Sequence, residues 1–174
     1  EMTSAIRTGF HQYTFPEDGS VSLLVDLNYT YHGTDIRNAV MEIDDSNDDF
    51  TAISGRFSGK NVSGHGKYTL YFYLETQQKV SSFKTWNGSR LYDKDSQTGN
   101  DLGVILNFDA KSNEPVRIKV SLSTVSSEQA KIDMHNEIPD WDFDQVKADA
   151  KDAWNDVLGK IKIETQLKVI LMVH

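Results

Sequence analysis

Two oxygen-rich segments of the sequence hold side chains that could bind a hard cation such as calcium, which prefers carboxylate and carbonyl oxygens. Aligned on Asp45, the first segment places Phe50 where a calcium-binding EF-hand loop requires glycine. It places Arg56 where that loop requires a closing glutamate. A solvated hairpin loop is therefore the better interpretation of its carboxylates, which are Glu42, Asp44, Asp45, Asp48 and Asp49.

The second oxygen-rich segment, residues 93–101, is the better candidate for calcium. Its carboxylates at Asp93, Asp95 and Asp101 could converge on one cation in a flexible loop. The segment lacks the bidentate glutamate that commonly completes such a site. We therefore expect a polar turn between two strands, and no metal-binding residue is assigned.

Trp86 is the aromatic residue best placed to bind a sugar ring, because Asn87-Gly88 follows it and predicts a turn at the end of a strand. An exposed indole can stack on the apolar face of a pyranose. The alternative is that it buries area at a strand end or at an interface. Trp86 is therefore the candidate substrate-binding residue, and no catalytic residue is assigned.

Other patterns that would indicate an active site do not hold. Residues 55–60 (GRFSGK) have one residue too few between the glycines of a phosphate-binding loop, and Asn61 stands where that loop needs Ser or Thr. The five histidines include no pair at the zinc-binding i, i+4 spacing, and the chain contains no cysteine. A carboxylate pair for sugar cleavage cannot be selected from 26 acidic residues by sequence alone.

Charge and hydropathy exclude two classes of partner. The formal net charge is −8 at pH 7, and the lysines and arginines are not clustered. Nucleic acids and anionic membranes both bind through clustered basic side chains, so we expect neither as a partner. The apolar stretch at residues 167–173 is far too short to span a bilayer.

The elements that must position Trp86 and the two loops are mostly strands. Apolar residues alternate with polar ones along much of the chain, which is typical of half-buried strands. Turn residues at 16–19, 32–33, 87–88 and 113–115 separate these runs without intervening helices. The pattern predicts a mainly β fold, an antiparallel β-sandwich over residues 1–125. The expected strands are residues 6–15, 21–29, 37–43, 50–57, 68–74, 80–86, 102–108 and 116–122.

The character of the sequence changes after Thr124. Ser126 predicts the cap of a short helix, with Gln129 completing a capping box. Asp142 predicts the cap of a longer helix that ends at Gly159 and whose apolar stripe includes Trp154, which we expect to be packed. Residues 161–163 predict a short terminal strand. Residues 126–174 are thus predicted to form a helical linker segment followed by that strand.

Three stretches of sequence resemble a known family in the family's own order. They are RTGFHQYTFP at residues 7–16, VSLSTVSSEQA at residues 120–130 and the helix at residues 142–161 with its DFD, AW and LGKI motifs. The chain is similar to the N-terminal domain of glycoside hydrolase family 92, the bacterial exo-α-mannosidases. Its sheet is then a partial, supersandwich-like one, because the family has a long stretch before the position of Glu1.

The resemblance implies a parent enzyme that hydrolyses terminal α-mannosides of glycans, with α-1,2 linkages as the expected ones. Such enzymes are secreted or periplasmic, especially in Bacteroides and its gut relatives, and they invert the anomeric carbon with the help of calcium. The family's catalytic carboxylates and calcium ligands lie in a later (α/α)6 barrel. This chain is thus expected to be an inactive fragment without a cofactor of its own. Its implied partners are that catalytic domain and mannose-containing glycans.

Residues 166–174 do not resemble the family's continuation, and the shortened sandwich predicts exposed sheet edges. Unpaired edges recruit further strands, so we expect self-association through strand pairing. Two other interpretations stay open. The chain could be a stand-alone carbohydrate-binding β-sandwich that uses Trp86 and residues 93–101. It could also be a structural sandwich without a ligand.

Overall fold

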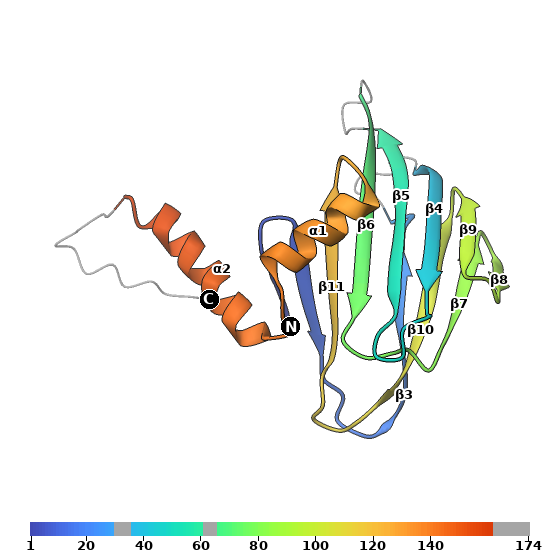
Figure 1. Ribbon diagram of the computed structural model, residues 1–174, viewed down its shortest axis with the longest axis horizontal. Helices are drawn as coiled ribbons and strands as arrows, with labels where there is room; N and C mark the ends of the chain where they lie inside the picture. The colour runs from blue at the N-terminus through green and yellow to red at the C-terminus, as the bar shows by residue number, and fades with distance from the viewer. Residues whose placement is uncertain (30–35, 61–65, 162–174) are drawn as a thin grey trace, which may run out of the picture.

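A computed structural model describes residues 1–29, 36–60 and 66–161 of the chain. Two antiparallel sheets pack face to face and two helices follow them (Figure 1). The predicted mainly β sandwich with a helical C-terminal part is confirmed. The predicted turn at 32–33, most of the predicted terminal strand at 161–163 and the stretch 166–174 lie outside the described residues.

Within the described residues the larger sheet has seven strands and the smaller has four. The larger sheet runs β1 (Met2–Ser4), β2 (Thr8–Tyr13), β11 (Val116–Ser123), β6 (Lys67–Thr76), β5 (Ala52–Lys60), β4 (Arg37–Asp44) and β9 (Ser96–Gly99). The smaller sheet runs β3 (Gly19–Asp26), β10 (Leu102–Ala110), β7 (Ser82–Asn87) and β8 (Arg90–Tyr92). The two sheets face each other across one apolar core.

The core forms where the alternating apolar residues of both sheets point inward. Val104, Leu106 and Phe108 of β10 are fully buried, and Met41 and Ile53 reach them from the larger sheet. The residues between them on β10 point to the other face, as the period of two in a strand requires. The hydrophobic pattern of the sequence therefore sets which face of each strand enters the core.

The strand boundaries differ from the predicted ones in three short elements. The predicted strand at 6–15 is shortened to β2, and β1 precedes it outside the predicted range. The Ala5 amide donates to the Thr8 carbonyl at 2.8 Å and turns the chain between β1 and β2. Strands β8 and β9 are three and four residues long, too short and too polar to show alternation. They are nevertheless paired, β8 with β7 and β9 with β4.

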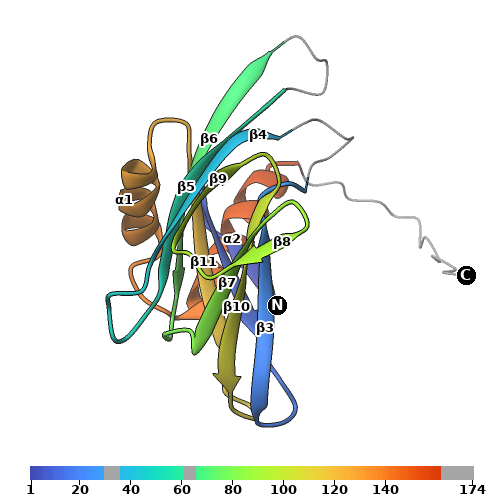
Figure 2. The same ribbon diagram turned by 90° about the vertical axis from the view of Figure 1, so that its right-hand side faces the viewer.

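Helix α1 (Ser127–Glu137) covers the outward face of the larger sheet, on the side away from the smaller sheet (Figure 2). The Gln129 amide donates to the Ser126 hydroxyl at 3.0 Å, which confirms the predicted cap. Ala130 and Met134 are fully buried against Tyr73 of β6. The helix is thus held by packing onto strands that lie far from it in sequence.

Helix α2 (Phe143–Leu158) begins at the predicted cap, where the Asp142 carboxylate accepts from the Gln145 amide at 3.0 Å. It extends away from the sheets after its first turn (Figure 1). Phe143 is buried, but Trp154 is 67% exposed. The prediction that Trp154 is packed is wrong, because nothing in the described part of the chain covers the second half of the helix's apolar stripe. Among the described residues, no helix is long and apolar enough to cross a membrane.

Candidate functional site

Trp86 lies on the outward face of the smaller sheet, where strand register aligns four residues. Gly103 is the cross-strand partner of both Trp86 and Asp26, and Leu91 is the other partner of Trp86. Since paired residues share a face of the sheet, Asp26, Gly103, Trp86 and Leu91 form one row across four strands. We call these four residues the tryptophan row.

The indole of Trp86 lies on the backbone of Gly103. A side chain at position 103 would place its Cβ only 2.0 Å from Cζ2 and 2.2 Å from Cη2 of Trp86, closer than any real contact. The glycine therefore makes room for the ring. Trp86 is half-buried, so part of its indole is supported by the sheet and part of it reaches solvent.

Polar groups stand at the Asp26 end of the tryptophan row. The Asn28 amide donates to Asp26 Oδ1 at 2.8 Å, and Asn28 Nδ2 donates to Asp101 Oδ1 at 3.3 Å. The Gly88 amide donates to the Asp101 carbonyl at 2.8 Å, which ties the turn after Trp86 to the same loop. Asp26 is exposed and Asp101 is partly exposed.

The rest of this outward face is uncovered by helices. Lys84 pairs with Asp93 at 3.3 Å, and both side chains are largely exposed. Asn107 accepts from the Ser22 hydroxyl at 2.6 Å and donates to the Ser82 hydroxyl at 3.0 Å. Leu24 and Leu91 are 68% and 58% exposed. The face combines hydroxyl, amide and apolar groups with one ion pair.

Residues 93–101 do not assemble a cation site. Asp93 is held by Lys84, whereas the carbonyl of Asp95 accepts from the Ile43 amide at 2.7 Å on the other sheet. The Asp101 side chain turns to Asn28. Two of the three carboxylates that the sequence grouped as a possible ligand set, those of Asp93 and Asp101, are thus engaged at different places, and the backbone of Asp95 pairs with the larger sheet.

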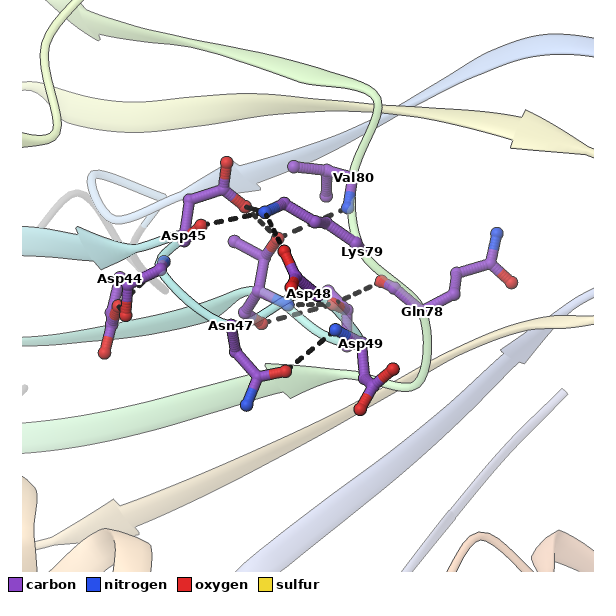
Figure 3. A network of polar contacts seen from close by, with 11 residues as sticks. Asp44, Asp45, Asn47, Asp48, Asp49, Gln78, Lys79 and Val80 are labelled. Atoms are coloured by element: carbon purple, nitrogen blue, oxygen red, sulfur yellow. Dashed lines mark hydrogen bonds and ion pairs between the residues drawn. The ribbon is translucent and has the colours of Figure 1, made fainter.

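The acidic segment between β4 and β5 is closed by a lysine (Figure 3). Lys79 Nζ donates to the Asp45 carbonyl at 3.0 Å and lies 3.9 Å from Asp45 Oδ1 and 4.0 Å from Asp48 Oδ1. The Thr51 hydroxyl also donates to Asp45 Oδ1, at 2.7 Å, and Ser46 caps Asp44 through its amide and hydroxyl. The ammonium group thus offsets part of the negative charge of this segment.

The other patterns considered in the sequence have structural roles. Residues 55–60 lie in strand β5. A Cβ at Gly55 would lie 2.1 Å from the Val40 carbonyl oxygen, so the close approach of β4 requires glycine there. His11 contacts the Tyr13 hydroxyl at 3.0 Å, and burial lowers the pKa of His11. In the described part of the chain, no three His, Asp or Glu side chains are grouped to hold a metal. His32, His65 and His174 lie outside it.

A buried lysine that the sequence did not single out joins the sheet to the helices. Lys119 of β11 is 1% exposed, and its Nζ donates to the Ile138 carbonyl at 2.9 Å, at the C-terminal end of α1. The same Nζ lies 4.0 Å from the centre of the Trp141 ring. Burial lowers the pKa of Lys119, while Glu75 and Asp140 oppose that shift.

Further contacts fix the helical exit at its base. Phe10 of β2 meets Trp141 and Phe143 edge to face, with ring centres 5.7 and 5.2 Å apart. Arg7 donates from its amide and its guanidinium to Glu137, at 2.9 and 3.3 Å. The start of α2 is therefore set rigidly against the sheet, and its far end is not.

The far half of α2 carries a continuous exposed apolar surface. Trp154, Val157, Leu158 and Ile161 are each more than half exposed. Beside them a hollow of about 380 Å³ opens between α2 and the turn after β1, where Ile6 is 87% exposed. We call this the α2 apolar surface, made of Ile6, Trp154, Val157, Leu158 and Ile161.

Family models match both parts of the chain. Residues 1–123 match the model of the glycosyl hydrolase family 92 N-terminal domain. Residues 129–171 match the model of the glycosyl hydrolase family 92 catalytic domain. The α2 apolar surface thus lies almost wholly in the segment that matches the catalytic-domain model, and that match includes part of the stretch 166–174.

Similar proteins are all much longer than this chain. A solved glycosyl hydrolase of family 92 is 34% identical to this chain, with a TM-score of 0.86. The match covers 95% of this chain and 21% of that hydrolase. A family 92 α-mannosidase from Bacteroides thetaiotaomicron is 23% identical with a TM-score of 0.77, covering 95% and 22%. An uncharacterized secreted glycosidase from Arthroderma benhamiae is 26% identical over 186 residues, covering 95% and 23%. The chain therefore spans between a fifth and a quarter of these relatives.

Proposed function

Because the chain belongs to glycosyl hydrolase family 92, we propose that it is the N-terminal β-sandwich and helical exit of an α-mannosidase that removes terminal α-mannosyl residues from glycans. The expected linkage is α-1,2, and the expected location is outside the cytoplasm, secreted or periplasmic. One observation carries the proposal. The apolar surface that the chain leaves uncovered falls in the segment that matches a catalytic domain.

The free energy of apolar burial explains why that surface needs a partner. Burying a large apolar side chain stabilises a protein by roughly 1.5–3 kcal/mol. Trp154, Val157 and Leu158 gain little of this in the chain alone, although they share one stripe of α2. The remainder of the catalytic domain is the partner that would cover them. The sandwich would then support that domain through the rigid base of α2.

Two of the similar structures, both from Bacteroides thetaiotaomicron, support the mannose specificity. One is a family 92 α-mannosidase and the other is a family 92 inverting mannosidase. The calcium of the family does not fit the residues described here, because they contain no group of three ligating side chains. In this proposal calcium binds in the remainder of the catalytic domain. The acid and base carboxylates of an inverting hydrolysis belong there as well.

The first test measures mannose release from α-1,2-linked mannobiose by this chain and by the full parent polypeptide. We expect release by the parent only. Release by this chain would place the catalytic groups within it and overturn the proposal. A parent that cleaves another glycoside and leaves α-mannosides intact would do the same.

A matched pair of variants in the parent tests the role of the α2 apolar surface. Trp154→Asp should lower both the mannosidase activity and the thermal stability, because it places a charge in a covered interface. Asp152→Lys on the same helix should leave both nearly unchanged, because Asp152 is exposed and lies on the face opposite the apolar stripe. Equal effects of the two substitutions would argue against an interface here.

The stand-alone carbohydrate-binding sandwich remains a second candidate function, favoured by the exposed part of the Trp86 ring. It predicts that the chain binds glycans without help from any other domain. It also predicts that no reading frame for the rest of a catalytic domain follows the coding sequence.

A further inference from the structure

The strands that carry the tryptophan row, β3, β10, β7 and β8, lie on the opposite side of the sandwich from α1 (Figure 2). The row contributes little to the main core, since Trp86 points outward while Thr85 beside it is buried. The indole is thus supported by the sheet and uncovered on its outer side, where a ligand can bind.

The geometry points to a second carbohydrate-binding site on this face, and we propose that the tryptophan row binds the chain of a neutral mannose-containing glycan at a distance from the catalytic centre. The inference deepens the proposed function, because the ligand is of the same class as the proposed substrate. It does not depend on hydrolysis, since binding to the row uses only residues described here.

The chemistry of the row suits a pyranose in two ways. The C–H face of a sugar ring stacks on an indole. The close contact with Gly103 restricts the indole before binding, so binding a sugar costs little side-chain entropy. Carboxylate and amide side chains next to such a ring bind hydroxyl groups, and Asp26, Asn28 and Asp101 supply them at one end. Leu91 extends the apolar surface at the other end.

The charges around the row restrict the ligand. Lys84 on this face is paired with Asp93, and Asp26 and Asp101 make the end of the row acidic. An anionic ligand would be repelled there, whereas a neutral glycan would not. Calcium is not needed to shape the row, because hydrogen bonds already fix Asp26 and Asp101.

The experiment titrates this chain with α-linked mannopentaose, with and without EDTA, and follows heat by calorimetry and the Trp86 indole N–H by NMR. We expect saturable binding that EDTA does not change and a shift of the Trp86 resonance. The spectroscopic signal needs no substitution, so it tests the inference even if a variant is unstable. No binding, a Trp86 signal that does not move, or binding that EDTA abolishes would each overturn the inference.

Three variants locate the binding. Trp86→Ala should weaken it roughly tenfold or more, as truncation of an aromatic anchor does. Gly103→Ala should also weaken it, because the new Cβ displaces the ring without removing it. Leu24→Ala is the control on the same face, outside the row, and should leave the affinity within about twofold. Thermal unfolding verifies that each variant is folded, and unchanged affinity in a folded Trp86→Ala variant would overturn the inference.

The outcome is separable from that of the proposed function. A parent that hydrolyses mannobiose, together with a chain that binds no mannopentaose, would overturn the inference and leave the proposed function in place. A parent without α-mannosidase activity would contradict the proposed function while leaving the binding by this chain in place.

Discussion

The outward faces of the two sheets start from the same sequence pattern and end differently. On β11, Lys119 and Ser121 alternate with apolar residues and are buried at 1% and 0% exposure. On β7, Lys84 alternates in the same way and remains largely exposed. The difference is that α1 and the start of α2 cover the first face, and nothing in the described chain covers the second. Alternation therefore shows which residues share a face of a sheet, but it does not show which face is exposed to solvent.

The largest expected effect separates the two ends of α2. Phe143→Ala should lower the free energy of unfolding by about 3–5 kcal/mol, because it empties a packed site between Phe10 and Ile138. Trp154→Ala in this chain should change it by less than about 0.5 kcal/mol, because the indole is 67% exposed. Urea unfolding of both variants measures the difference. Similar losses would mean that the far end of α2 is packed in solution.

A second pair compares the two outward-facing lysines. Lys119→Ala should cost about 2–4 kcal/mol, because it removes a buried side chain and leaves the Ile138 carbonyl without its donor. Lys84→Ala should cost between about 0 and 1 kcal/mol, the usual contribution of an exposed ion pair. Chemical unfolding at neutral pH distinguishes them. If the two costs are equal, the cover over β11 is weaker than the contacts indicate.

The pH dependence of stability gives a smaller effect of the same lysine. Burial lowers the pKa of Lys119 below its ordinary value of 10.5, so the unfolded chain binds the proton more tightly than the folded protein. Stability must then rise with pH between the lowered pKa and 10.5, as the penalty for burying the charge disappears. The free energy of unfolding of the protein, measured against that of Lys119→Met across this alkaline range, should show this rise. A flat difference would show that Lys119 keeps its ordinary pKa.

The smallest expected effect concerns strand β3, which forms one edge of the smaller sheet. Strand β3 pairs only with β10 in the described structure and leaves its other side unpaired, which favours weak self-association. Leu24→Lys should weaken that association several-fold, because a charge on an edge strand opposes strand pairing. Val125→Lys, outside any strand, serves as the control. A monomer mass that does not depend on concentration in sedimentation would exclude the association.

Local signals in the sequence predicted much of this fold. The two predicted helix caps, Ser126 and Asp142, are correct because each depends only on a hydrogen bond between the cap side chain and the backbone amide three residues later. The long strands are correct because each has enough residues to show alternation. Strand β9 was missed because its partner β4 lies far away in the sequence. Strand β8 pairs with the neighbouring β7 across the turn after Asn87, and it was missed because three residues are too few to show alternation.

The candidate sites were predicted less completely, because they depend on contacts between distant segments. The turn after Trp86 marked the residue, but its seat on Gly103 comes from a register seventeen positions further along the chain. Lys119 gave no signal at all, since nothing in a period of two shows that a helix will cover one face. The stripe of α2 correctly grouped Trp154 with apolar neighbours, but a stripe does not show whether its partner is present.

The lysine that closes the acidic segment has a consequence for how that hairpin responds to its surroundings. Lys79 is attached to the same polypeptide as Asp45 and Asp48, so this counter-ion has a fixed stoichiometry and cannot diffuse away. A bound metal has a dissociation constant and leaves when the medium is depleted of it. The turn between β4 and β5 therefore keeps this one counter-ion in any medium, and a single ammonium group offsets part of the charge of Asp44, Asp45, Asp48 and Asp49.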